Sequence, residues 1–154
     1  VVAAEPLAAG DAFVLDASVT ATWLLPDEHT DASRRLFAGV RSGDVELHAP
    51  DLWLVECGNI IVNAVRRKRT TAANALALWQ VLDSVRTRCE LYRPEPPQVR
   101  AALALALERN LSLYDATYLW LAQSLSLPLL TQDALLARAA KAQGVVVVSM
   151  ESVA

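Results

Sequence analysis

Residues 12–26, AFVLDASVTATWLLP, pass from a short apolar run to a helical pattern and then to a proline. The apolar run that ends at Asp16 predicts a buried strand over 12–16. The residues that follow predict a short helix over 18–25, because the ring of Pro26 stops a helix at the preceding residue. A strand joined directly to a helix is the building unit of an α/β fold.

The same alternation continues along the chain. We expect helices over 31–42, 50–67, 71–88, 96–110, 115–124 and 133–143, and strands over 45–48, 90–93, 127–131 and 145–149. Strands separated by helices favour a mainly parallel sheet with helices on both faces, so the predicted fold class is α/β, a three-layer α/β/α sandwich. Residues 1–10, VVAAEPLAAG, predict a flexible N-terminal tail, and residues 11–154 predict one domain.

The composition excludes several classes of protein. The 154 residues are 54% hydrophobic and carry a net charge of −3, which indicates a folded core and no bulk basic field for nucleic acid. The five glycines form no phosphate-binding loop, and the two cysteines and two histidines form no zinc motif. No apolar run reaches the roughly 18 residues of a membrane helix and no signal peptide is evident, so we expect a cytoplasmic protein.

Three aspartates stand beside predicted helix starts. Asp16 closes the first strand, Asp133 follows the strand over 127–131, and Asp115 opens the helix over 115–124. Ligands of parallel sheets bind beyond the carboxyl ends of the strands, so we expect these carboxylates to converge at one edge of the sheet. Each of them alone is also explained as a helix N-cap, a position that Asp favours.

Glu56 is harder to explain by local structure. It lies in the helix over 50–67, which is apolar on most faces, as buried helices are, and its polar residues Glu56, Asn59 and Asn63 form one stripe. A buried glutamate needs an arginine, a hydrogen-bond network or a cation shared with other carboxylates. Acids that meet without an interior Lys or Arg repel one another, and a divalent cation removes that repulsion. Oxygen ligands favour Mg²⁺ or Mn²⁺, whose usual work in such a site is phosphate chemistry.

Four segments carry a resemblance to a known family. The segments VLDASVTATWLLPDE, APDLWLVECGNIIVNAVRRKR, LSLYDATYLWLA and LLTQDALLARAA are similar, in this order, to the successive motifs of PIN-domain ribonucleases. The chain most resembles the small VapC toxins of VapBC toxin–antitoxin pairs, over residues 13–148. It departs from them in Gly58, which lies inside a predicted helix where glycine costs stability, and in the tail before Gly10.

The resemblance implies an endoribonuclease that hydrolyses RNA with metal-bound water, using Mg²⁺ or Mn²⁺. It implies Asp16 and Asp115 as direct metal ligands, Asp133 at a second metal or a ligand water, and Glu56 at that metal or at the attacking water. It further implies that the toxin pairs with a VapB-like antitoxin and forms a homodimer. The residues that match the family's supporting positions are Ser18, Asn59 and Thr131.

An acidic cleft must still hold a polyanion. Four of the fourteen basic residues are consecutive, which predicts contacts to RNA phosphates from Arg66, Arg67, Lys68 and Arg69. The alternative is a solvated helix end that the helix dipole favours. The segment 23–25, Trp-Leu-Leu, is the best candidate for an exposed apolar patch, near which the resemblance implies an antitoxin groove.

Other functions remain in competition. A phosphatase of the haloacid dehalogenase type needs a D-x-D motif after its first strand, where this chain has Asp16-Ala17-Ser18, and a receiver domain needs paired acids there. A catalytically silent interaction module of the same fold would use the acids as helix caps. A housekeeping PIN-type RNA-processing nuclease would share the whole site with a toxin.

Overall fold

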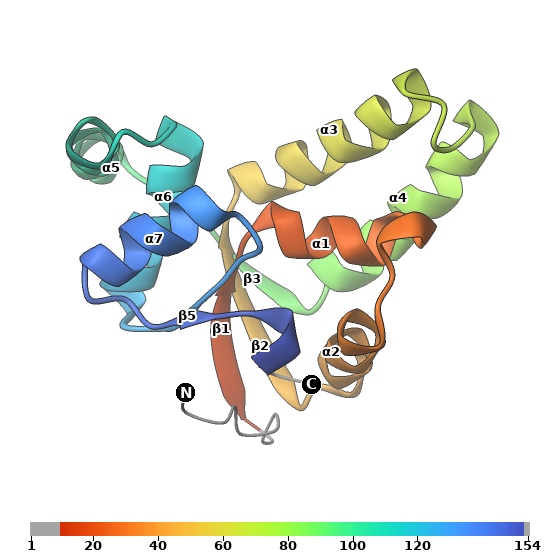
Figure 1. The fold of residues 1–154 in the computed structure, drawn as a ribbon, viewed down its shortest axis with the longest axis horizontal. Coiled ribbons are helices and arrows are strands. Elements are labelled where there is room, and N and C mark those ends of the chain that lie inside the picture. The colour runs from red at the N-terminus through yellow and green to blue at the C-terminus, as the bar shows by residue number, and fades with distance from the viewer. Residues whose placement is uncertain (1–9, 153–154) are drawn as a thin grey trace.

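The computed structural model describes residues 10–152, in which five strands lie between two groups of helices (Figure 1). The sheet runs in the order β3-β2-β1-β4-β5, and all its pairings are parallel. The predicted α/β class is therefore confirmed, with β1 at the centre of the sheet. The strands are β1 (Asp11–Leu15), β2 (Val45–Pro50), β3 (Cys89–Tyr92), β4 (Leu129–Leu130) and β5 (Val147–Val148).

Helices cover both faces of this sheet. Figure 1 shows α1 to α4 on one side and α5 to α7 on the other, which are the layers that the sequence predicts. None of the helices within residues 10–152 is long and apolar enough to cross a membrane. The helices are α1 (Ala17–Leu24), α2 (Asp31–Ser42), α3 (Leu52–Arg66), α4 (Ala72–Arg86), α5 (Pro96–Arg109), α6 (Leu113–Leu125) and α7 (Ala134–Ala142), with short 3-10 turns η1 (Pro26–Glu28) and η2 (Met150–Ser152).

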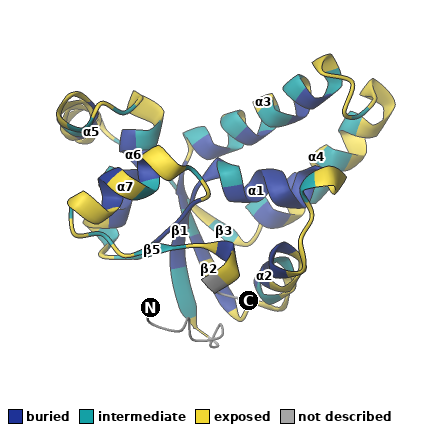
Figure 2. Ribbon diagram, in the orientation of Figure 1, coloured by how far each residue is buried: buried dark blue, intermediate teal, exposed yellow. Residues whose placement is uncertain are grey.

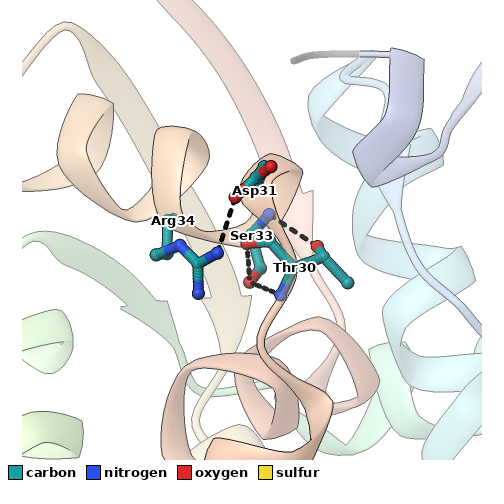
Figure 3. A network of polar contacts seen from close by, with 4 residues as sticks. All are labelled: Thr30, Asp31, Ser33 and Arg34. Atoms are coloured by element: carbon teal, nitrogen blue, oxygen red, sulfur yellow. Dashed lines mark hydrogen bonds and ion pairs between the residues drawn. The ribbon is translucent and has the colours of Figure 1, made fainter.

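The ends of α2 show how local chemistry sets an element. The Thr30 hydroxyl accepts the backbone N–H of Ser33 at 3.0 Å, and the Ser33 hydroxyl accepts that of Thr30 at 2.9 Å (Figure 3). This reciprocal pair satisfies backbone donors that the first turn leaves free. Gly43 ends the helix at φ +85°, a left-handed conformation that glycine adopts without strain. Both ends agree with the sequence prediction.

The starts of α3 and α6 lie two residues from the predicted positions, whereas those of α1, α4 and α7 lie one residue from them. Pro50 is the last residue of β2, where it pairs with Tyr92. The helix expected from residue 50 therefore begins at Leu52. The helix expected from Asp115 begins two residues earlier, since Ser112 takes the cap position and accepts the Asp115 N–H at 3.0 Å.

The buried residues gather on the central strands and on the helix faces that cover them (Figure 2). Val14 and Leu15 of β1 are fully buried. The exposed patch predicted over residues 23–25 is wrong, because Trp23 is 6% exposed and its indole N–H donates to the Ser33 carbonyl at 3.0 Å. The predicted tail lies outside the described residues except for Gly10, whose N–H donates to the Asp44 carbonyl.

Helix α3 is buried on one face only, so the prediction of a fully buried helix is wrong. Trp53 and Cys57 face the core, whereas Val55 and Val62 are 75% and 45% exposed. The cause is the position of α3, which packs against α1 and α4 and extends away from the sheet (Figure 1). Apolar residues on its outer face consequently remain in contact with solvent.

Candidate active site

Asp16 lies directly after β1, at the centre of the carboxyl edge of the sheet. It precedes α1 but its side chain forms no cap bond with that helix. Instead Oδ2 accepts the hydroxyls of Ser18 at 2.5 Å and Thr131 at 2.7 Å. Burial raises the pKa of Asp16, the two hydroxyl bonds lower it, and the charge of Asp115 raises it again. The explanation of Asp16 as a helix cap is therefore wrong.

The two hydroxyls that hold this carboxylate are themselves held. The backbone N–H of Gln132 donates to Ser18 Oγ at 3.0 Å, and that of Asp133 donates to Thr131 Oγ1 at 3.0 Å. A hydroxyl that accepts a backbone N–H keeps its own proton free for a carboxylate. The loop after β4 thus fixes the orientation of Asp16 through contacts of the kind that a supporting role requires.

Glu56 projects from α3 and is half-buried. Its Oε2 accepts a hydrogen bond from the hydroxyl of Tyr118, a fully buried residue of α6. Desolvation raises the pKa of Glu56, the Tyr118 hydroxyl lowers it, and the charges of Asp16 and Asp115 raise it. Tyr118 is absent from the residues predicted for the site, although its spacing of three residues from Asp115 on one helix was an available signal.

Asp115 lies in the first turn of α6 and is half-buried. The hydroxyl of Ser112 donates to Asp115 Oδ2 at 2.7 Å, and Ser112 rather than Asp115 caps the helix. Its carboxylate is therefore not needed as a cap, and its charge raises the pKa of both Asp16 and Glu56. We call Asp16, Glu56 and Asp115 the acidic trio, because each of them interacts electrostatically with another member.

Asp133 and Asn59 stand apart from the acidic trio. Asp133 Oδ1 accepts the backbone N–H groups of Leu135 and Leu136, both at 2.8 Å, so for this residue the capping explanation is confirmed. Its Oδ2 lies outside the cap, and its charge is not among those that shift the trio. Asn59 is exposed on α3 and takes no part in the bonds that hold the trio within the described chain.

The acidic trio has the donor chemistry of a site for a hard divalent cation. Over residues 10–152, none of its carboxylates forms an ion pair with Lys, Arg or His. Carboxylate oxygens suit Mg²⁺ and Mn²⁺, and a cation would relieve the repulsion within the trio. In the same residues no group of three or more His, Cys, Asp or Glu side chains is arranged so that it could hold a metal ion.

The consecutive basic residues lie at the turn between α3 and α4. Residues 66–69 are all exposed, and Lys68 adopts a left-handed φ of 57° where the chain reverses. The guanidinium of Arg69 is already engaged, because it donates to Asp27 at 2.7 Å and to Glu28 at 2.6 Å. Three of the four cations thus stand clear of this pair of acids, on a hairpin that extends beyond the sheet (Figure 1).

Known proteins resemble this chain along most of its length. Residues 13–142 match the sequence profile of the PIN domain family. A relative from Pyrobaculum aerophilum named ribonuclease VapC3 is 30% identical over 128 residues, which cover 80% of this chain and 91% of the relative. A second relative from the same organism, named exonuclease VapC9, is 36% identical over 83 residues, which cover 53% of this chain and 58% of the relative.

Solved structures share the fold. PAE2754 from Pyrobaculum aerophilum superposes with a TM-score of 0.69 at 23% identity, over 92% of this chain and 91% of that chain. FitAcB from Neisseria gonorrhoeae superposes with a TM-score of 0.63 at 15% identity, over 90% of this chain and 98% of that chain. At these identities the likeness concerns the architecture alone, which is the one described above.

Proposed function

The chain belongs to the PIN domain family and to its VapC-type nucleases, and we propose that it is an endoribonuclease that hydrolyses RNA phosphodiester bonds with Mg²⁺ or Mn²⁺. The observation that carries this proposal is the acidic trio at the carboxyl edge of a parallel sheet. The charge of Asp115 raises the pKa of Asp16 and of Glu56, and no carboxylate of the trio has a basic partner in the described chain. Repulsion between partly buried carboxylates lowers the stability of the fold. An arrangement of this kind is therefore better explained by cation binding than by a purely structural role.

Each member of the site has a proposed role. Asp16 and Asp115 hold the metal, and Glu56 orients the attacking water or holds a second ion. A bound divalent cation supplies a water of lowered pKa and neutralises charge on the phosphate. Ser18 and Thr131 keep the Asp16 carboxylate in one orientation, since both donate to its Oδ2. Asp133 contributes through the oxygen that its helix cap leaves free, whereas for Asn59 the described contacts offer no support.

Binding of the RNA backbone is assigned to the turn at residues 66–69. Arg66 ends α3, the helix that carries Glu56, and Arg67 and Lys68 follow it. All three are exposed, so they extend the site away from the acidic trio. Phosphate contacts from such residues raise affinity without regard to sequence. Arg69 has a mainly structural part, because Asp27 and Glu28 hold its guanidinium.

Two protein partners belong to the proposal, a VapB-like antitoxin and a second copy of the chain. Apolar side chains remain exposed on outward helix faces, including Val55 of α3, Leu76 of α4 and Leu107 of α5, each at least 75% exposed. Contiguous apolar patches are typical of interaction surfaces, and Val55 and Leu76 lie on two helices that pack against each other. Light scattering at micromolar concentration should give the mass of a dimer. A monomer at every concentration would contradict the proposed pairing with a second copy of the chain.

Cleavage of a defined RNA, in linear and in circularised form, tests the activity. With Mg²⁺ or Mn²⁺ the wild type should cut both forms, and EDTA, Asp16→Asn or Asp115→Asn should abolish cutting. Asp31→Asn is the matched control, because Asp31 also begins a helix but pairs with Arg34 on the remote α2 (Figure 3). Cutting of the linear form alone would indicate an exonuclease, and cutting that survives both site variants would overturn the proposed centre.

Growth of cells on induced expression distinguishes a toxin from a housekeeping nuclease. A toxin should arrest growth when expressed alone, and Asp16→Asn should remove the arrest. Rescue by an antitoxin reading frame adjacent to the gene would support the pairing. Normal growth with an active nuclease would favour the housekeeping alternative.

A further inference from the structure

We propose that Tyr118 is the positioning residue for Glu56, so that α6 sets the placement of two acids of the trio rather than one. The inference rests on the proposed nuclease function and deepens it. It is carried by the hydrogen bond from the Tyr118 hydroxyl to Glu56 Oε2, which joins α6 to α3. Residues 56 and 118 lie far apart in the sequence, and neither helix alone brings them together.

The Tyr118 hydroxyl has a role that packing does not explain. Its residue is fully buried among the core side chains, where phenylalanine would fill almost the same space. Burying a hydroxyl costs free energy unless a partner accepts its proton. The partner here is an ionisable carboxylate, and a hydrogen bond to such a group is stronger than one between neutral groups. The hydroxyl of Tyr118 is therefore explained by its hydrogen bond to Glu56 and not by packing in the core.

Glu56 needs such a partner because its own helix does not hold it. Helix α3 is exposed along one side, and Val55, the residue before Glu56, is 75% exposed. A glutamate side chain has several rotatable bonds and loses entropy when it is held in place. Repulsion from Asp16 and Asp115 would turn an unheld Glu56 toward solvent. The Tyr118 hydroxyl opposes this rotation, because it donates to Glu56 Oε2 from a fully buried position.

Helix α6 is suited to this task because it also carries Asp115. Positions 115 and 118 are three residues apart and share a face of the helix. The Ser112 hydroxyl holds Asp115 at the start of α6, and α6 packs against β1 and β2. One rigid element thus supplies an acid directly and places a second acid through a hydroxyl.

Tyr118→Phe tests the inference with two measurements. The kcat for RNA cleavage should fall by about 10-fold or more, with KM unchanged, and Mn²⁺ affinity measured by calorimetry should weaken in the same variant. The matched control is Tyr92→Phe, which removes a hydroxyl 3.0 Å from His48 Nδ1 and should change neither quantity. Circular dichroism melts fix a temperature at which every variant is folded.

A double variant separates positioning from a general effect on the core. If Tyr118 acts through Glu56, then Glu56→Gln with Tyr118→Phe should cleave no more slowly than Glu56→Gln alone. Losses that multiply, or a Tyr118→Phe variant with wild-type kcat and Mn²⁺ affinity, would overturn the inference while the nuclease function stands. A wild type that neither cleaves RNA nor binds Mn²⁺ would overturn both.

Discussion

The hydroxyl of Thr131 donates to Oδ2 of Asp16 at 2.7 Å, across two neighbouring strands. Leu15 of β1 pairs with Leu130 of β4, and the hydrogen-bonded residues each follow a member of that pair. The register of the parallel sheet therefore brings the hydroxyl to the carboxylate. A substitution that removes this bond therefore acts on the centre of the proposed site.

Thr131→Val removes the hydroxyl and keeps the shape of the side chain. Asp16 then loses one of its two hydroxyl donors, and the backbone N–H of Asp133 loses its acceptor. We expect the free energy of unfolding to fall by about 1–3 kcal/mol. We expect kcat for RNA cleavage to fall by roughly 10-fold or more. Urea unfolding and initial rates at saturating RNA measure the two effects.

Two variants control this experiment. Thr131→Ser keeps the hydroxyl and should retain most of the activity. Thr22→Val removes a buried hydroxyl that donates to the Val19 carbonyl at 2.7 Å, so it should lower stability and leave kcat unchanged. If Thr131→Val behaves like Thr22→Val, Thr131 does not support the site.

The metal-free protein should lose stability as pH rises, because burial raises the pKa of Asp16 above its unfolded value. The folded state then binds this proton more tightly than the unfolded chain, so the free energy of unfolding falls from about pH 4 upward through the folded pKa. Asp16→Asn removes this dependence and should be more stable than the wild type at pH 7 in EDTA. Urea titrations from pH 4 to pH 8 measure the free energy of unfolding of both proteins. A wild type that gains stability relative to Asp16→Asn as pH rises would contradict the prediction.

Divalent metal should reverse the loss of stability that follows deprotonation of Asp16. At a concentration about 100 times Kd, a ligand that binds only the folded state adds roughly 2.7 kcal/mol. For a chain of this length each kcal/mol raises Tm by about 2–4 °C. Mn²⁺ should therefore raise the Tm of the wild type and of Asp31→Asn by several degrees, but not that of Asp16→Asn or Asp115→Asn. An equal rise in all four proteins, measured by scanning calorimetry, would indicate binding elsewhere.

The sequence predicts the order of elements well because turn and cap residues act locally. Thr30 and Gly43 bound α2 through contacts within a few residues, which a local pattern captures. The pattern of α3 misleads for a physical reason. Apolar residues such as Val55 and Val62 have the same character whether a core or a protein partner is to cover them. The error at Trp23 is the opposite one. An exposed position was predicted for it because it lies close to Pro26, and it is buried.

The candidate site was predictable in its residues but not in how each side chain is used. Asp16, Asp115 and Asp133 all stand at helix starts, and only the side-chain rotamer decides which of them caps a helix. In the structure Asp133 does so, whereas Asp16 turns to two hydroxyls. Tyr118 escaped prediction because its partner lies 62 positions away and is brought near by tertiary packing alone.

The exposed cations at the α3–α4 turn should control the salt dependence of RNA binding. Arg66→Ala and Arg67→Ala should each weaken affinity for single-stranded RNA and lower the slope of log K against log salt by about 0.7. Arg35→Ala, on the remote α2, removes the same charge and should change neither. Arg69→Ala breaks bonds to Asp27 and Glu28 and should mainly lower stability. Fluorescence anisotropy at several salt concentrations, with Asp16→Asn as the inactive background, measures the slopes, and equal slopes would contradict the assignment.

Asp133 has two separable roles, and paired substitutions distinguish them. Its Oδ1 caps α7 through the backbone N–H groups of Leu135 and Leu136. Asp133→Asn keeps a capping oxygen but removes the charge, so stability should be retained while kcat falls if Oδ2 serves the site. Asp133→Ala should also lower stability by about 1 kcal/mol, because both N–H groups lose their acceptor. An Asp133→Asn variant with unchanged kcat in the RNA assay would show that this acid is a cap alone, and the catalytic centre would then consist of the acidic trio.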